Sequence, residues 1–398
     1  EMSASLVGSE MCIRDRYFIT ELGIIMSENR LVATCLLGLE GLVADELRRM
    51  DIKNVEPQNG RVLFSGNQSE IARANICSRY SERILIEMGS FRALSFTELF
   101  DNVKKLPWEQ WIGKDDAFPV TGRTLNSKLS SIPDCQSIIK KAIVERLKTK
   151  YRISWFEESA SSVKVKFLIM KDVASIMIDT SGVGLHKRGY RENAASAPIK
   201  ETLAAAMADL SHIRPFSRVI DPFCGSGTIL IESALKALNI APGLRRRFIA
   251  EKWSCADQNA WRTERERAQD LIDRSAEFQA YGYDIDPQAI ELTNENAKKA
   301  GVAARIHTEV RSIADFSSDL PKAAIICNPP YGERLLDIQQ AQDIYRTMGE
   351  KFLKREGYSY CIISPDDKFE EIFGRPADKR RKLYNGMIKC QVYMYFRR

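Results

Sequence analysis

From residue 198 onward the chain alternates short apolar runs with longer segments of helical spacing, and this alternation restricts its fold more than any other feature. Strands joined by helices form a parallel sheet with helical crossovers. Near the end, Asn385-Gly386 separates two β-rich runs and predicts a hairpin, because both residues tolerate positive φ. We therefore expect an α/β domain whose mostly parallel sheet ends in an antiparallel hairpin, with the earlier strands at 219–220, 280–284, 304–310, 323–327 and 358–364.

The chain ahead of this domain shows shorter elements and divides into two α+β units. Residues 26–89 contain predicted strands at 31–37, 60–65 and 84–88 and predicted helices at 40–50 and 68–77. Residues 90–184 contain predicted helices at 95–105 and 135–148 and predicted strands at 118–122, 163–170 and 173–179. The third domain is expected at 185–398. Residues 1–25 lack a clear period, and we expect them to be a non-native or disordered leader.

Net positive charge is concentrated in the middle of the chain. Residues 90–191 carry 18 Lys and Arg against 11 Asp and Glu, whereas the remaining chain carries 41 against 42. A segment with this excess is suited to facing phosphates. The loop at its end is basic and bears an aromatic ring, so we expect RNA contacts from Lys187, Arg188, Tyr190 and Arg191.

Composition excludes several other classes of protein. No apolar run reaches the roughly 18 residues needed to span a bilayer, so no membrane partner is expected. The 9 cysteines form no Cys-x-x-Cys pair and there are only 3 histidines, so no metal site is expected. Scattered cysteines are usually reduced, which favours a cytoplasmic protein.

The segment from Asp221 to Thr228, Asp-Pro-Phe-Cys-Gly-Ser-Gly-Thr, stands between a short strand and a predicted helix. Its two glycines allow a sharp turn and close approach of a ligand. The third glycine of a dinucleotide fingerprint is replaced by Leu230, and no Gly-Lys-Ser/Thr follows. An acidic residue ahead of the glycines suits a cation, such as the ammonium and sulfonium of S-adenosylmethionine. The predicted cofactor contacts here are Asp221, Phe223, Cys224, Gly225, Gly227 and Thr228.

The next strand ends in Asp284-Ile285-Asp286-Pro287. A carboxylate at this position can accept both ribose hydroxyls, so Asp284 and the adjoining Ile285 are predicted cofactor contacts. Asp286 is better interpreted as a helix N-cap. Asp284 lies 57 residues past Gly227, where about 20 is usual, so residues 241–275 are interpreted as an insertion. After the third strand, Ser312 or Asp315 could reach the adenine amino group; both stay open, and Ser312 is carried as the candidate.

The fourth strand of the sheet is followed by Asn328-Pro329-Pro330-Tyr331, the predicted catalytic tetrad. An amino group on a base is a poor nucleophile, and two acceptors can draw its nitrogen towards tetrahedral geometry. The side-chain oxygen of Asn328, also a predicted cofactor contact, and the carbonyl of Pro329 could serve, since consecutive prolines fix the backbone. Tyr331 could stack on an extruded base. Methyl transfer would then depend on positioning and need no metal.

These motifs, with Leu185-His-Lys-Arg-Gly-Tyr-Arg191, Pro198-Ile-Lys-Glu-Thr-Leu203 and Lys382-Leu-Tyr-Asn-Gly386, resemble the THUMP-domain RNA guanine-N2 methyltransferases. The likeness is closest to the bacterial large-subunit ribosomal RNA branch. It implies a ferredoxin-like amino-terminal domain, a THUMP domain over the basic segment and a Rossmann-like class I methyltransferase domain. It also implies N2-methylguanosine in 23S ribosomal RNA as the product.

Three alternatives remain open from the sequence. A tRNA guanine-N2 methyltransferase would have the same domains. An adenine-N6 DNA methyltransferase shares Asn-Pro-Pro-Tyr, although the basic module ahead of the catalytic domain argues against DNA. A non-enzymatic RNA-binding adaptor would lack S-adenosylmethionine binding.

Overall fold

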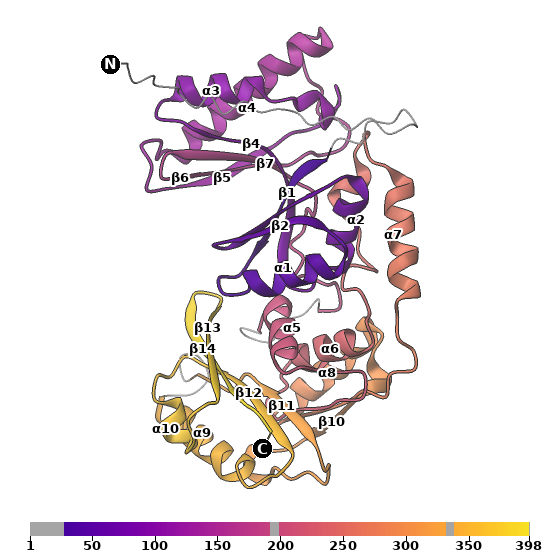
Figure 1. The fold of residues 1–398 in the computed structure, drawn as a ribbon, viewed down its shortest axis with the longest axis vertical. Helices are drawn as coiled ribbons and strands as arrows, with labels where there is room; N and C mark the ends of the chain where they lie inside the picture. The colour runs from indigo at the N-terminus through magenta and orange to yellow at the C-terminus, as the bar shows by residue number, and fades with distance from the viewer. Residues whose placement is uncertain (1–27, 192–198, 332–337, 398) are drawn as a thin grey trace, which may run out of the picture.

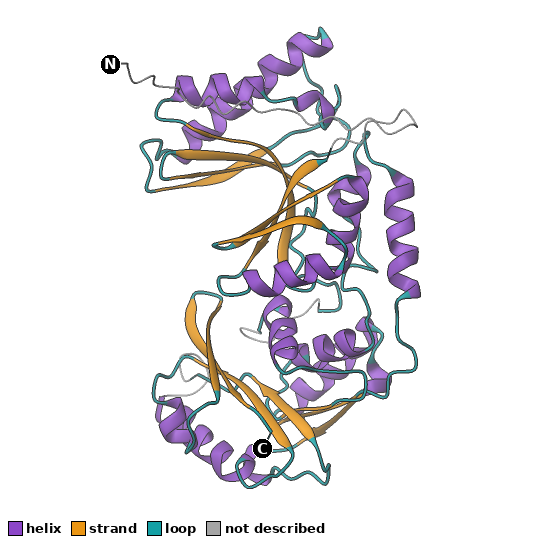
Figure 2. Cartoon of the chain, in the orientation of Figure 1, coloured by secondary structure: helices purple, strands orange, loops and turns teal. Residues whose placement is uncertain are grey.

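The computed structural model describes residues 28–191, 199–331 and 338–397, which form two seven-stranded sheets with their helices (Figure 1). The units succeed one another along the long axis of the molecule, and the carboxyl-terminal sheet lies at the end opposite α3 and α4 (Figures 1 and 2). The predicted leader at 1–25 lies outside the described residues. So does Pro198, the first residue of one motif in the family resemblance.

The first sheet has the strand order β2-β3-β1-β4-β7-β6-β5. All of its neighbours are antiparallel except β5 and β6. The elements up to β4 are β1 (Asn29–Cys35), α1 (Glu40–Arg49), β2 (Lys53–Gln58), β3 (Arg61–Gly66), α2 (Gln68–Cys77) and β4 (Ser81–Arg92). They are followed by α3 (Phe96–Lys105), the 3-10 turn Trp108–Gln110, β5 (Val120–Leu125), α4 (Ile132–Tyr151), β6 (Val165–Met170) and β7 (Val173–Asp179).

Strand β4 joins the two predicted α+β units into one sheet. Its residues 81–86 pair with β1 and its residues 85–92 pair with β7, with a register shift in the second pairing between Glu87 and Gly89. The sequence predicted only residues 84–88 as a strand, because the polar ends of β4 do not alternate. Because β4 is hydrogen-bonded to a neighbouring strand on each side, it can form even where its sequence does not alternate between apolar and polar residues.

The second sheet has the order β10-β9-β8-β11-β12-β14-β13. The first five strands are parallel and the last two form the antiparallel hairpin predicted around Asn385-Gly386. Its strands are β8 (Arg218–Asp221), β9 (Gln279–Asp284), β10 (Ile306–Val310), β11 (Ala323–Cys327), β12 (Tyr358–Ser364), β13 (Lys379–Asn385) and β14 (Ile388–Tyr395). Its helices are α5 (Glu201–Leu210), α6 (Thr228–Ala237), α7 (Gln258–Asp270), α8 (Pro287–Ala300), α9 (Ile338–Phe352) and α10 (Phe369–Phe373), with 3-10 turns at Ile249–Lys252, Ala303–Arg305 and Ile313–Asp315. These features confirm the expected fold class.

Alternate residues of the central strands face opposite helical layers. Val219 and Ile326 belong to the core that includes α5, α6 and α8, whereas Ile220 and Ile325 belong to the core that includes α9 and α10. This period-two alternation is expected for a sheet covered on both faces. The sheet is therefore rigidly held beneath the loops at its edges.

The insertion at 241–275 contains α7 and packs against the amino-terminal unit, where α7 lies beside α2 (Figure 1). Arg73 of α2 forms a bidentate ion pair with Glu264 of α7, at N···O distances of 2.7 and 2.9 Å. Gly243 donates its N–H to the carbonyl of Ile76 at 2.8 Å, and a Cβ there would lie 2.7 Å from backbone oxygens. The insertion thus fastens the catalytic domain to the first sheet.

Among the described residues, no helix is long and apolar enough to cross a membrane, and no cluster of His, Cys, Asp and Glu is arranged to hold a metal ion. The eight described cysteines are free thiols.

Candidate active site

The carboxyl ends of β8, β9, β10 and β11 bring the predicted site residues to one edge of the sheet. Asp221 ends β8, Asp284 ends β9, Ser312 follows β10 and Asn328 follows β11. These strands are neighbours and parallel. In an open α/β sheet this edge is where ligands bind.

Asp221 is buried, with 1% of its surface exposed. One carboxylate oxygen accepts the N–H of Phe223 at 3.1 Å, and no basic side chain in the described chain pairs with it. Burial, with a smaller contribution from the charge of Asp284, raises the pKa of this carboxyl to about 8. A buried carboxyl with no cation beside it is suited to a positively charged ligand.

The loop after Asp221 is held in shape by hydrogen bonds from its neighbours. Asp284 accepts the N–H of Gly225 at 2.9 Å and that of Asp286 at 3.0 Å. Thr293 of α8 donates to the carbonyl of Gly225 at 2.8 Å. Gly225 has a φ of 53°, and a Cβ added there would meet nothing within 4 Å. The loop therefore presents open space at a glycine, where a ligand can approach the backbone closely.

The other predicted cofactor contacts lie in different surroundings. Ile285 is 74% exposed, so its apolar side chain is available to cover a flat ring. Ser312 caps the turn that follows it by accepting from Ala314 at 3.2 Å, while Asp315 is exposed. Cys224 and Thr228 are both buried. The Cys224 thiol accepts from Thr293 at 3.7 Å, and the Thr228 hydroxyl bonds to Ser226 at 3.1 Å and to Arg191 at 3.0 Å.

Side-chain contacts of Cys224 and Thr228 with a ligand therefore do not fit this structure, since both side chains are used inside the protein. Their backbones still form the loop. Phe223 is half-buried and packs with the second face of the sheet. Asp286 is the N-cap of α8, accepting from Gln288 at 2.9 Å, with Pro287 at the first helical position, as the sequence predicted.

The tetrad after β11 is folded so that its two polar ends meet. The hydroxyl of Tyr331 donates to the side-chain oxygen of Asn328. The carbonyl of Pro330 accepts from the hydroxyl of Tyr345 at 3.0 Å, whereas no described residue donates to the carbonyl of Pro329. The predicted pair of acceptors on Asn328 and Pro329 therefore remains compatible with this geometry.

Two side chains that sequence reasoning missed support the tetrad. Tyr345 of α9 fixes Pro330 as described, and Asn385 at the end of β13 donates to the hydroxyl of Tyr331 at 3.3 Å. Burial raises the pKa of Tyr331 well above its ordinary value, so this hydroxyl stays protonated and can donate. Asn385 was interpreted only as a turn residue, because its distance from Tyr331 in sequence conceals their contact.

The basic loop does not have the orientation that the sequence suggested. Arg188 and Tyr190 are buried, and both bond to the Glu232 carboxylate of α6, at 3.4 and 3.0 Å. Arg191 pairs with Glu201 at 3.1 Å. The predicted RNA contacts of these three side chains do not fit this structure, because their hydrogen-bonding groups are used in the interior; only Lys187 of the four is exposed.

The residues present fit S-adenosylmethionine. The unpaired Asp221 suits its positive charge, the open loop at Gly225 admits its chain, and Asp284 with the exposed Ile285 is placed for ribose and adenine. Asp284 already accepts two backbone N–H groups, so it holds the loop whether or not it also accepts ribose hydroxyls.

Three protein-family descriptions match successive parts of the chain. "RlmL ferredoxin-like domain" matches residues 30–85, "THUMP domain" matches 93–179, and "RMKL-like, methyltransferase domain" matches 188–394. The last covers more than half of the chain.

Curated relatives extend over nearly the whole sequence. "Putative RNA methyltransferase YpsC" of Bacillus subtilis is 40% identical over 93% of this chain and 97% of its own length. "Ribosomal RNA large subunit methyltransferase K/L" of Psychromonas ingrahamii is 33% identical over 90% of this chain, which spans only 49% of that longer relative.

Solved structures agree with the fold. A "predicted N6-adenine-specific DNA methylase" from Listeria monocytogenes has a TM-score of 0.89 and 42% identity, covering 94% of this chain and 97% of its own. "SMU.472, a putative methyltransferase complexed with SAH" has a TM-score of 0.89 and 39% identity, covering 93% and 98%.

Proposed function

Since the chain belongs to the RMKL-like methyltransferase family and uses S-adenosylmethionine as its cofactor, we propose that it methylates a guanine N2 amino group in 23S ribosomal RNA. In this proposal the loop from Asp221 to Thr228, together with Asp284, Ile285 and Ser312, holds the cofactor. The tetrad Asn328 to Tyr331 holds the base. Residues 90–184 and Lys187 contact the RNA backbone.

The observation that carries the proposal is the position of Asn328, which follows β11 directly beside the Asp221 loop after β8. When bound, S-adenosylmethionine supplies an electrophilic methyl group on a sulfonium centre. Asn328 and the carbonyl of Pro329 would each accept an N–H of the target amine, which localises the nitrogen lone pair. The ring of Tyr331 would stack on the extruded base. These groups would act by position, and the proton that the nitrogen loses once it carries the methyl group would pass to water.

Support for RNA comes from two directions. The segment 90–191 has an excess of seven positive charges, and most of it, residues 90–184, precedes the catalytic domain, where it can bind a backbone. The names of the two curated relatives described above refer to RNA, and one of them to large-subunit ribosomal RNA. The choice of guanine N2 rests on the resemblance of the motifs.

Two alternatives have specific support. The shared tetrad and the name given to the Listeria protein favour adenine N6 in DNA. The same arrangement of domains would also serve a tRNA guanine-N2 methyltransferase.

The deciding experiment offers the purified chain and methyl-labelled S-adenosylmethionine separate pools of 23S RNA, 16S RNA, tRNA and duplex DNA. We expect label in 23S RNA, recovered as N2-methylguanosine after nucleoside digestion. Label recovered as N6-methyladenosine, or only in DNA, would contradict the choice of base, and label only in tRNA would contradict the choice of RNA. An Asn328→Ala variant serves as the control for contaminating enzymes.

A further inference from the structure

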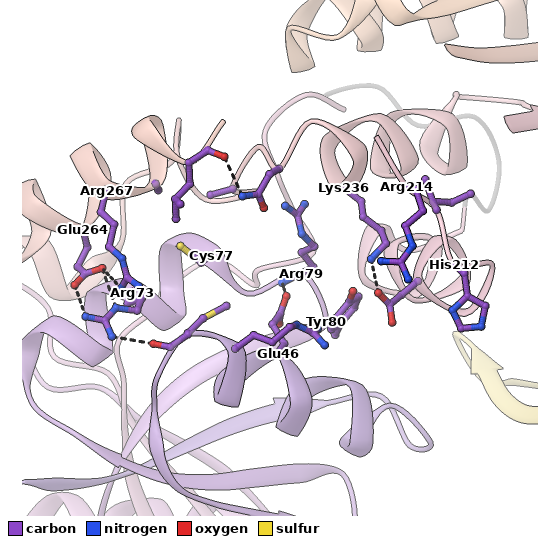
Figure 3. Close-up of a pocket in the computed structure, with 18 residues that line it drawn as sticks. Glu46, Arg73, Cys77, Arg79, Tyr80, His212, Arg214, Lys236, Glu264 and Arg267 are labelled. Atoms are coloured by element: carbon purple, nitrogen blue, oxygen red, sulfur yellow. Dashed lines mark hydrogen bonds and ion pairs between the residues drawn. The ribbon is translucent and has the colours of Figure 1, made fainter. Parts of the chain in front are cut away.

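A cavity of about 640 Å³ lies between the amino-terminal unit and the catalytic domain (Figure 3). The ends of α1 and α2 line one side, and the ends of α5 and α6 with part of α7 line the other. Arg214 in its wall precedes β8, whereas Asp221 ends that strand. The cavity therefore lies at the opposite edge of the sheet from the candidate active site, and the methyl transfer does not account for it.

The lining contains more Arg and Lys side chains than Asp and Glu side chains. Of the three acidic residues in the lining, Glu264 is bound by Arg73 and Asp209 by Lys236. The third, Glu46, accepts the Ser78 hydroxyl at 2.8 Å and the backbone N–H of Arg79 at 2.9 Å. Three guanidinium groups in the lining, those of Arg49, Arg79 and Arg214, form no ion pair or side-chain hydrogen bond with any residue of the described chain.

Arg79 is the most informative of these three. The residue is only 9% exposed, and its Nη1 is buried without a hydrogen-bond partner. In Figure 3 its side chain lies between the Arg73–Glu264 pair on one side and Lys236 on the other. A buried guanidinium nitrogen without a hydrogen-bond partner is unfavourable, and an oxygen of a bound anion would supply the missing acceptor. Arg49 and Arg214 are exposed, as residues at the entrance of a charged site would be.

We propose that this cavity binds a phosphate group, with Arg79 as the inner contact and Arg49 and Arg214 approaching from the two domains. Guanidinium groups match phosphate oxygens in a bidentate manner, and several of them can surround a tetrahedral anion. The volume falls within the range of about 300–1,000 Å³ typical of small-molecule sites, so the phosphate can belong to a larger molecule. Because Arg49 and Arg79 come from the amino-terminal unit and Arg214 from the catalytic domain, the bound anion would stabilise their contact.

The test measures thermal unfolding and calorimetric binding of the full chain with inorganic phosphate, against chloride at equal ionic strength. We expect phosphate, and not chloride, to raise the Tm in a saturable manner. The variant Arg79→Met keeps the length of the side chain and removes its charge, and it should bind phosphate at least about tenfold more weakly. Arg262→Met is the matched control, since Arg262 is exposed on α7 outside the cavity lining and should leave the affinity unchanged.

No phosphate-specific rise in Tm, or the same affinity in Arg79→Met as in the parent, would overturn the proposal. If Arg79→Met does not fold, the exposed residues provide the test: Arg49→Gln and Arg214→Gln should each weaken phosphate binding, and unchanged affinity in both would overturn it. Competition between phosphate and a short RNA identifies RNA backbone as the source of the phosphate. Independent binding of the two identifies a free small anion.

Discussion

The hydroxyl of Tyr331 donates a hydrogen bond to the side-chain oxygen of Asn328, so the acceptor expected to meet the target amine is held by its own motif. Asn385 donates to the same hydroxyl from the terminal hairpin. In the proposed complex the target amine would approach the same oxygen. Tyr331 therefore has two possible roles. Its hydroxyl can bond to the Asn328 oxygen before the base binds, and its ring can stack on the base.

Replacing Tyr331 distinguishes these roles. Tyr331→Phe keeps the ring and should retain most of the methyl-transfer activity, because the substrate amine takes the place of the hydroxyl. Tyr331→Ala loses base stacking worth about 1–3 kcal/mol, which corresponds to about a 5- to 150-fold fall in kcat/KM. Steady-state kinetics on 23S RNA measures both variants. Equal losses in the two would show that the hydroxyl, rather than the ring, is required.

Asn328→Ala should abolish most of the chemistry while the protein still binds its cofactor. Removing one preorganised hydrogen-bonding group from a transition state costs about 10²–10³ in kcat. Calorimetry with S-adenosylmethionine should still show binding, because Asp221 and Asp284 remain. Asn385→Ala is the matched control: it removes an amide that contacts Tyr331 and not the base, so its loss should be much smaller. A normal kcat in Asn328→Ala would refute the assignment.

Cofactor affinity should depend on pH through Asp221. The pKa of this buried carboxyl is raised to about 8, so it is mostly protonated at neutral pH in the free protein. A cation prefers the ionised form, and binding below pH 8 must therefore release a proton. The Kd for S-adenosylmethionine should increase as pH falls from about 8, by up to about tenfold per pH unit.

Calorimetry between pH 6.5 and 9 in buffers of different ionisation enthalpy would measure both the affinity and the released proton. Asp221→Asn should bind weakly, and its remaining pH dependence reports titration of the ligand alone. A parent protein with the same pH dependence as Asp221→Asn would exclude this role for the carboxyl.

The gathering of the candidate site residues at one edge of the sheet could be predicted from sequence because its signals are local. Asp221 and Asp284 end their strands and Asn328 directly follows its strand, and parallel strands bring such ends together. Asn385 and Tyr345 could not be found in this way, because their contacts with the tetrad join distant segments. The local sequence shows which strand precedes a residue, but it does not show which distant residues contact it in the fold.

The basic loop shows the converse error. Arg188 and Tyr190 were interpreted by residue type as surface contacts, yet they satisfy the buried Glu232 of α6. An arginine is suited both to phosphate and to a buried carboxylate, so composition alone does not separate the two. Strand β2 was missed for a related reason, since its exposed, polar sequence lacks an apolar alternation.

Lys187 and Arg188, although adjacent, should therefore respond differently to substitution. Lys187→Ala should leave the Tm unchanged and weaken RNA binding modestly. The slope of log affinity against log salt concentration should fall by about one, the value for one phosphate contact. Arg188→Ala leaves Glu232 buried without its cation and should destabilise the fold by about 3–5 kcal/mol. Filter binding across a salt series and thermal unfolding measure the two effects. A stable Arg188→Ala with weakened RNA binding would restore the surface role.

The ion pair between Arg73 and Glu264 should hold the insertion against the first sheet. Their side chains are 15% and 6% exposed, and the pairing raises the pKa of Arg73 above its ordinary value. Arg73→Met leaves the buried Glu264 carboxylate with only the longer ionic contact to Arg267 at 3.6 Å. Glu264→Gln leaves the Arg73 guanidinium with only the longer ionic contact to Glu70 at 3.9 Å. Each should therefore lower stability by about 3 kcal/mol, measured as a fall in Tm and in the urea midpoint.

The double variant should recover much of this loss, because no buried charge is left unpaired when both partners are neutral. The exposed pair Arg346–Asp343 on α9 provides the control, since both of its side chains are more than half exposed. The variants Arg346→Met and Asp343→Asn, alone and combined, should each change the free energy of unfolding by less than about 1 kcal/mol. If the single and double variants at Arg73 and Glu264 behave as the control does, solvent reaches this contact and the ion pair does not fix the insertion.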